Sequence, residues 1–202
     1  MSKRKRDAGP WYPPEAYGEL AEGIQRVLIP ADRIQERVLA LGREISVDYA
    51  GRCPLLIGVL KGVVPFMADL LRAITVPVEV DYMAVASYSA EARNKGMVRL
   101  EKDLSLPITG RDVLFVEDII DTGLTLNYLL RTLRTRDPAS LEVCVLFNKE
   151  QPRLINIPLK YKGFDVPDLL VVGCGLDFRE RYRNLPFVGL LKPEVFQADV
   201  ED

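Results

Sequence analysis

The stretch from Val113 to Leu130 constrains the fold of this chain more than any other. It begins with four apolar residues, 113–116, which are typical of a fully buried strand. Glu117 and Asp118 follow, and after a short run of small and polar residues the leucines recur at helical spacing from residue 126. The pattern predicts a strand, an acidic pair at its end, a polar loop and then a helix.

The loop between the strand and the helix, residues 121–125, is a candidate anion site. Ligands of open parallel sheets bind outside the carboxyl ends of the strands. The first amides of a helix have no internal partner and lie at the positive end of its dipole, so they accept an anion. This loop offers such amides, two threonine hydroxyls and a glycine that lets the backbone approach closely. We expect it to bind a phosphate, with Glu117 and Asp118 nearby for sugar hydroxyls or a hard cation.

Two other interpretations fit the same residues. Asp and Thr are common helix caps, so an ordinary strand followed by a capped helix would give this pattern. Asp121, Thr122 and Gly123 also form the Asp-Thr-Gly triplet of aspartic proteases, whose chemistry needs two facing carboxylates. The chain has one such triplet, and it leads into a helix, which argues against a protease.

The composition limits which classes of protein this chain can belong to. With 202 residues, 48% of them hydrophobic, one sizeable core is expected. No apolar run approaches the roughly 18 residues of a membrane span, and no signal-peptide core is present. The net charge of −2 gives no general reason to expect a nucleic-acid partner. The three cysteines are far apart and read as reduced, mostly buried thiols, so we expect a cytoplasmic protein.

The absence of histidine excludes more kinds of catalytic and metal site than any other feature of the composition. With no His in the chain, Ser-His-Asp triads, His-based metal sites and imidazole acid–base catalysis are all excluded. Proton transfer must therefore use a carboxylate, Lys, Tyr, Cys or water. A metal site without His or a Cys cluster must be built from oxygen ligands, which suit magnesium or manganese.

The rest of the chain divides into segments of different character. Residues 1–29 read as an extension whose first part, with four basic residues and three prolines, is a disordered tail; a basic arm for nucleic acid is the alternative. Residues 78–88 alternate as a long strand with Val80 and Tyr82 on one face. Prolines 152 and 158 mark an irregular link, and residues 163–168 lead into a strand at 169–172. Residues 194–202 form an acidic tail.

Two lysines follow predicted buried strands. Lys61 comes after the strand at 55–60 and begins a tight turn with Gly62, and Lys149 comes just past the strand at 141–147. A solvated turn is the structural alternative for Lys61. A lysine at the carboxyl end of a parallel strand is otherwise unusual for a structural role.

The segment EDIIDTG, residues 117–123, with Thr125 after it, resembles the phosphoribosyl pyrophosphate (PRPP) motif of the type I phosphoribosyltransferases, and most the hypoxanthine-guanine branch. The Leu60-Lys61-Gly62 turn, the Lys149 segment and the closing segments at 176–177 and 183–186 match the same family in order. The resemblance covers about residues 30–193. It implies an α/β fold in which a twisted parallel sheet has helices on both faces, with a small hood subdomain from about 153–193 and the N-terminal segment.

The resemblance implies a role for each matched residue. For the ribose and 5′-phosphate of PRPP it implies Glu117, Asp118, Asp121, Thr122, Gly123, Leu124 and Thr125. For pyrophosphate it implies Lys61, Gly62 and Arg183, with a cis peptide expected between Leu60 and Lys61. For the purine it implies Lys149, Leu170, Val171 and Asp177, and for a lid Ser87 and Tyr88. The implied metal is Mg²⁺, with Mn²⁺ as a substitute, on Asp177, Glu117 and Asp118. The implied catalytic residues are Asp121, Lys149 and Arg183.

The implied activity is purine salvage, in which the phosphoribosyl group of PRPP is transferred to a 6-oxopurine by a homodimer or homotetramer without nucleic-acid or membrane partners. Leu170 departs from the family, which usually has an aromatic ring there to stack on the purine; leucine keeps an apolar wall without a ring quadrupole. Two alternatives stay open: a related enzyme for xanthine or uracil, and a PRPP-sensing regulator that binds nucleic acid. The sequence shows no basic face or DNA-binding module in favour of the regulator.

Overall fold

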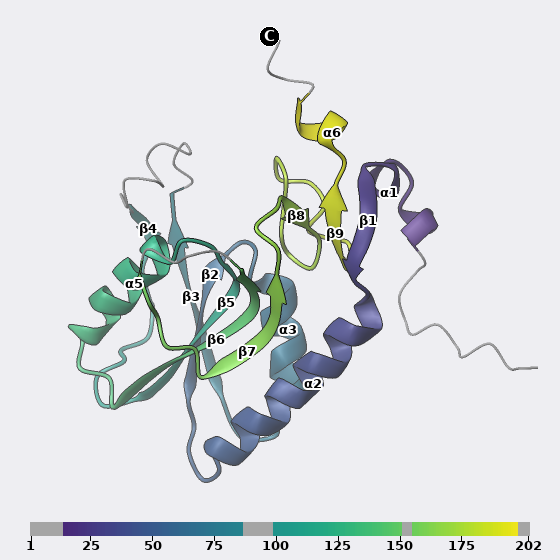
Figure 1. The fold of residues 1–202 in the computed structure, drawn as a ribbon. Helices are drawn as coiled ribbons and strands as arrows, with labels where there is room; N and C mark the ends of the chain where they lie inside the picture. The colour runs from purple at the N-terminus through teal and green to yellow at the C-terminus, as the bar shows by residue number, and fades with distance from the viewer. Residues whose placement is uncertain (1–13, 87–98, 151–154, 198–202) are drawn as a thin grey trace, which may run out of the picture. The chain divides into compact units, whose positions relative to one another are not determined.

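The computed structural model of the protein describes residues 14–86, 99–150 and 155–197 (Figure 1). The chain forms two compact units: unit 1 comprises Met1–Glu36 and Leu169–Asp202, and unit 2 comprises Arg37–Asp168. The domain limits expected from the sequence, near residues 29, 153 and 193, stay a prediction.

Unit 2 is built on a six-stranded sheet with the order β4-β3-β2-β5-β6-β7. The strands are β2 (Leu55–Leu60), β3 (Glu79–Val85), β4 (Leu100–Lys102), β5 (Asp112–Ile120), β6 (Ser140–Lys149) and β7 (Tyr161–Val166). All neighbours pair in parallel except β3 and the short edge strand β4, which are antiparallel. The α/β fold expected from the sequence is confirmed, with a mixed rather than purely parallel sheet.

Helices cover both faces of this sheet. In Figure 1, α5 (Leu124–Arg134) lies on one face, and α3 (Val64–Ala73) with the unit 2 part of α2 (Ala31–Asp48) lies on the other. Gly42 lets α2 approach α3 closely, since a Cβ atom at this position would lie 2.5 Å from the Cβ of Ala73. A layer of helix on each face buries the sheet on both sides, which explains why its central strands are continuously apolar.

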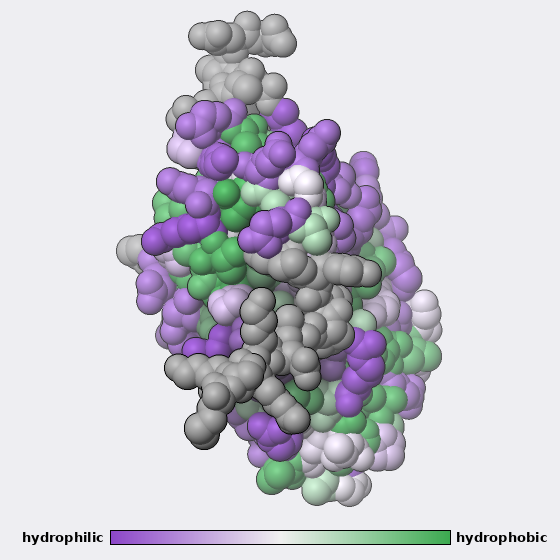
Figure 2. Space-filling model, turned by 90° about the vertical axis from the view of Figure 1, so that its right-hand side faces the viewer, coloured by the Kyte–Doolittle hydropathy of each residue, from purple (hydrophilic) through white to green (hydrophobic). Residues whose placement is uncertain are grey.

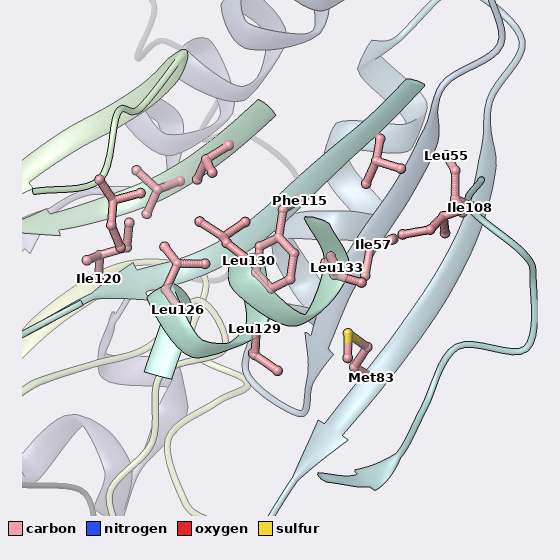
Figure 3. Packing of buried hydrophobic residues seen from close by; sticks show 14 residues of the cluster. Leu55, Ile57, Met83, Ile108, Phe115, Ile120, Leu126, Leu129, Leu130 and Leu133 are labelled. Carbon is pink, nitrogen blue, oxygen red and sulfur yellow. The ribbon is translucent and has the colours of Figure 1, made fainter. Parts of the chain in front are cut away.

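The leucines of α5 fill the core on their side of the sheet. Leu126, Leu129, Leu130 and Leu133 are all buried, as their helical spacing predicts, and Figure 3 shows them against Phe115 and Ile120 of β5. Leu55, Ile57 and Met83 extend the cluster onto β2 and β3. This packing fixes the start of α5 at the end of β5.

Two elements differ from the sequence prediction. β5 runs on through Glu117 and Asp118 to Ile120, because β6 is long enough to pair with it as far as Asn148. β7 was not predicted; it pairs with β6 at the sheet edge. On β3, Val80 and Tyr82 share one face, as the alternation predicted; they are half-buried, whereas Asp81 and Met83 on the opposite face are buried.

Unit 1 is a small antiparallel sheet with the order β1-β9-β8. Its strands are β1 (Ile24–Ile29), β8 (Val171–Val172) and β9 (Val188–Leu191), and its helical segments are η1 (Pro14–Tyr17), α1 (Glu19–Glu22) and α6 (Pro193–Gln197). A separate small core contains Val172, Tyr182, Leu185, Phe187 and Leu191.

On the face that Figure 2 shows, hydrophobic residues gather in small patches among hydrophilic ones. None of the helices in the described ranges has the length and hydropathy needed to cross a membrane.

Candidate active site

The carboxyl end of β5 carries the acidic pair. The Oε2 atom of Glu117 is buried and has no hydrogen-bond partner among the residues that the structure describes. Burial, and then the negative charge of the neighbouring Asp118, raise the pKa of the Glu117 carboxyl well above its usual range. Asp118 accepts a hydrogen bond from the backbone N–H of Ile119 at 2.7 Å. A buried carboxyl oxygen without a partner fits a ligand that donates to it, such as a sugar hydroxyl or a hydrated cation.

The loop after β5 has the backbone of an anion site. Gly123 lies at the N-cap of α5 with φ 81°, and no side chain of the described chain caps this helix. A Cβ at Gly123 would lie 3.3 Å from the Cδ1 of Ile157 and 3.4 Å from the carbonyl oxygen of Ile155. The first turn holds no acidic residue and the last turn holds Arg131 and Arg134, which suits the helix dipole. The first amides of α5 are thus left for a ligand, as a phosphate loop requires and an ordinary capped helix does not.

The loop that the resemblance assigns to pyrophosphate follows the neighbouring strand. β2 and β5 pair in parallel, with Gly58 opposite Val116, so their carboxyl ends lie at the same edge of the sheet. The Leu60–Lys61 peptide bond is cis, as the resemblance implied. The Lys61 side chain is exposed, Gly62 is buried, and the Lys61 carbonyl accepts a hydrogen bond from Val64 N–H at 3.2 Å. Lys61 and residues 121–125 therefore belong to one edge of unit 2.

Lys149 is the last residue of β6 and lies between two carboxylates. Its Nζ is 3.5 Å from Oδ2 of Asp121 and 3.1 Å from Oδ1 of Asp168. The structure brings together Asp121 and Lys149, two of the residues that the resemblance implies are catalytic. It adds Asp168, which sequence reasoning missed because Asp168 follows β7, a strand that was not predicted. The sequence signal that could have indicated this strand is the short apolar–polar alternation before the Val-Pro-Asp run at 166–168.

Unit 1 carries the remaining predicted site residues. The Arg183 guanidinium donates to the carbonyl of Gly175 at 2.9 Å and lies 2.9 Å from Oδ1 of Asp177 and 3.0 Å from Oε1 of Glu180. Asp177 and Arg183 are thus brought together by an ion pair within the segment 175–183. Val171 is buried in β8, opposite Leu190, and Leu170 is 37% exposed. The expected lid residues Ser87 and Tyr88 lie outside the described residues.

Comparison with known proteins identifies the family. Residues 30–179 match the phosphoribosyl transferase domain. The hypoxanthine-guanine phosphoribosyltransferase of Mycobacterium avium is 49% identical over 191 residues, which are 91% of this chain and 94% of that protein. The crystal structure of a hypoxanthine phosphoribosyltransferase from Staphylococcus aureus superposes with a TM-score of 0.84 at 41% identity, covering 88% of this chain and 96% of that one.

A longer relative contains the same domain as one part. The bifunctional protein TilS/HprT of Listeria monocytogenes is 48% identical over 173 residues, 86% of this chain, and the chain spans only 27% of that protein's length. The family match, the identity over most of the chain and the shared fold agree with the motif at 117–125. The chain belongs to the type I phosphoribosyltransferase family, among the hypoxanthine-guanine phosphoribosyltransferases.

Proposed function

We propose that this chain transfers the phosphoribosyl group of PRPP to hypoxanthine and guanine, giving IMP or GMP and pyrophosphate, as a step of purine salvage. The observation that carries this proposal is the Asp121–Lys149 pair beside the uncapped start of α5. The arrangement supplies an anion site, a carboxylate base and a donor-only ammonium at neighbouring strand ends.

The sugar and phosphate of PRPP have separate partners in this proposal. The backbone amides of residues 121–125 hold the 5′-phosphate, which fixes the orientation of the ribose. Glu117 and Asp118 accept hydrogen bonds from the ribose hydroxyls, which gives the orphaned Glu117 oxygen a donor. As the bond to pyrophosphate breaks, positive charge builds on the ribose ring, and the nearby carboxylates stabilise it.

The base is read and deprotonated by two residues. The purine attacks the anomeric carbon through N9, and Asp121 accepts the proton from N7. The Lys149 ammonium donates to the oxygen at position 6 of hypoxanthine or guanine. Adenine has an amino group there, which is itself a donor, so Lys149 would face an unpaired partner and reject it. Leu170 and Val171 contribute an apolar wall, and Lys61, Gly62 and Arg183 hold the pyrophosphate.

Magnesium is the metal that fits these residues. The described residues contain no group of three or more His, Cys, Asp or Glu side chains able to hold a metal by themselves. Mg²⁺ needs no such group, because it keeps several waters and uses one or two carboxylates together with substrate phosphates. The resemblance assigns the ion to Glu117, Asp118 and Asp177, of which one or two would contact it directly and the rest through its waters, with Mn²⁺ as a substitute. When bound, the ion neutralises the charge of the leaving pyrophosphate.

Turnover with a panel of bases tests the proposed function. Purified protein, PRPP and magnesium are incubated separately with hypoxanthine, guanine, xanthine, uracil and adenine, and product is measured by chromatography. We expect nucleotide from hypoxanthine and guanine and none from adenine, with loss of turnover in a chelator and recovery on adding magnesium. Faster turnover of xanthine or uracil would favour the related enzyme instead. A salt-dependent gel shift with nucleic acid and no turnover of any base would favour the regulator.

The homodimer or homotetramer and the cytoplasmic location are finer proposals that rest on the family resemblance. Sedimentation of the full chain over a range of concentrations would decide the oligomeric state.

A further inference from the structure

The ammonium of Lys149 has two carboxylate partners, Asp121 and Asp168, and the proposed reaction gives a role only to Asp121. Asp168 accepts a hydrogen bond from Nζ at 3.1 Å, and Asp121 lies at 3.5 Å on the same ammonium. The Lys149 side chain is only 17% exposed, whereas those of Asp121 and Asp168 are 56% and 50% exposed. The lysine is therefore the less solvated member of a three-residue cluster whose formal charge is −1.

The fold, rather than a chance rotamer, places Asp168 beside Lys149. Lys149 pairs with Val166 in the parallel ladder between β6 and β7, and the next amide, that of Glu150, donates to the Val166 carbonyl at 2.8 Å. Pro167 follows with a fixed φ, so the backbone position of Asp168 is set by the last pair of the ladder. The end of β6, which carries Lys149, is thus hydrogen-bonded to the end of β7, which leads to Asp168.

Proton transfer changes the charge balance of this cluster. In the proposed reaction the N7–H bond of the base breaks and an O–H bond forms on Asp121, which becomes neutral. With Asp168 present, the cluster passes from −1 to 0. Without it, the cluster would pass from 0 to +1, and a partly buried ammonium would be left without a counterion. The second carboxylate therefore favours the proton's arrival on Asp121.

We propose that Asp168 is a positioning residue that holds the Lys149 ammonium at the base and keeps it paired while Asp121 takes the proton. An ammonium has three donors, so Lys149 can keep its bond to Asp168 and still donate to the oxygen of a 6-oxopurine. This inference rests on the proposed function and assigns Asp168 no contact with PRPP.

The variant Asp168→Asn tests this role by removing the charge and keeping the size of the side chain. We expect kcat with hypoxanthine to fall about tenfold and the KM for hypoxanthine to rise, while the KM for PRPP stays within about twofold. Asp168→Glu, which restores the carboxylate, should recover most of the loss. The matched control is Asp69→Asn on α3, because Asp69 pairs with Arg72 and not with Lys149. It should leave these constants near those of the original protein.

A double-mutant cycle separates an effect through Lys149 from a general structural effect. In a Lys149→Met background, Asp168→Asn should cause no further loss of kcat/KM, because its partner is gone. Equal losses in both backgrounds, unchanged kinetics in Asp168→Asn, or a parallel rise in the KM for PRPP would each overturn the inference while leaving the proposed function intact. An original protein that neither turns over hypoxanthine nor binds IMP would overturn the proposed function and this inference with it.

Discussion

At the residue scale, the proposed chemistry depends on carboxylates and one lysine because the chain contains no histidine. Asp121 is the carboxylate placed both at the start of the phosphate loop and within 3.5 Å of the Lys149 ammonium. Glu117 differs from it, since its buried oxygen has no partner among the described residues and its pKa is raised by burial and by Asp118. Neighbouring carboxylates in one motif thus have different environments and different proposed roles.

The variant Asp121→Asn tests the base. An amide cannot accept the N7 proton, and a positioned general base contributes about 10²–10⁴ in rate. We expect kcat to fall by about that range, with an unchanged circular dichroism spectrum and melting temperature, because Asp121 is exposed. Steady-state kinetics with hypoxanthine measures the loss. Near-normal turnover would remove Asp121 from this role.

The variant Leu170→Phe tests where the base lies. Leu170 is 37% exposed, so a larger side chain can be accommodated with little cost in stability. If Leu170 lines the purine site, an aromatic ring should stack on the base and tighten its binding by about 0.5–1.5 kcal/mol. Competition kinetics with hypoxanthine measures this change. Unchanged or weaker base affinity would show that Leu170 does not line the site.

At the element scale, the proposed phosphate loop at residues 121–125 depends on how α5 begins. The buried leucines of α5 pack against β5, and this packing presents the first amides of the helix at the end of the strand. Gly123 makes the turn between the two elements with φ 81°. A Cβ atom added at Gly123 would lie 3.4 Å from the carbonyl oxygen of Ile155. Both the backbone angle and the lack of space call for glycine here.

Gly123→Ala should therefore lower stability and PRPP affinity together. The positive φ alone costs roughly 1 kcal/mol for a residue with a Cβ, and the contacts at Ile157 and Ile155 add to it. Gly110→Ala is the control, because Gly110 has φ 70° but its Cβ would meet nothing within 4 Å. Chemical denaturation should show a larger loss for Gly123→Ala, and only this variant should raise the KM for PRPP. Equal losses in the two variants would mean that the close contact is relieved by a small shift.

At the scale of the whole molecule, unit 2 is held by carboxylates that join segments far apart in the chain. Asp48 accepts a hydrogen bond from the Tyr161 hydroxyl at 2.7 Å, and Asp103 makes a two-point pair with Arg136 at 2.8 and 2.9 Å. Asp81, 7% exposed, accepts hydrogen bonds from Ser105 and Leu106 N–H at 2.6 and 2.9 Å. These bonds tie β3 to the chain beyond β4, α2 to β7, and α5 to the segment before β5.

The same carboxylates make the fold sensitive to acid. The Tyr161 bond lowers the pKa of Asp48, and the Arg136 bond lowers the pKa of Asp103. Burial raises the pKa of Asp81, but the N–H groups of Leu106, Tyr82 and Ser105 and the Lys102 ammonium outweigh it, so the pKa is lowered. A folded pKa below the unfolded value of about 3.9 gives stability that is present above that value and lost as the pH falls through the folded pKa.

We therefore expect the free energy of unfolding to fall from about pH 5 downwards. Asp81→Asn should cost about 1–3 kcal/mol at pH 7, because an amide cannot accept all the N–H bonds, and should flatten the acid limb. Asp69→Asn, which breaks only a surface pair with Arg72, should change stability little. Urea denaturation between pH 3 and pH 7 measures both variants. A slope as steep in Asp81→Asn as in the original protein would exclude Asp81 as its source.

The sequence alone determined the features that are local in the chain. The four apolar residues of β5, the polar turn after it and the leucine spacing of α5 lie within one stretch, so their strand, turn and helix preferences were readable without knowing any partner. Only the end of the loop expected at 121–125 differs, because α5 already begins at Leu124. The family and the α/β fold followed from motifs of this kind. The tertiary structure decided what depends on pairing between distant segments. Strand pairing extended β5 through its acidic pair, brought β7 to the sheet edge and buried Asp81 under backbone donors from residues 105 and 106. The ladder between β6 and β7 placed Asp168 on Lys149, because register, unlike periodicity, is set by both strands at once.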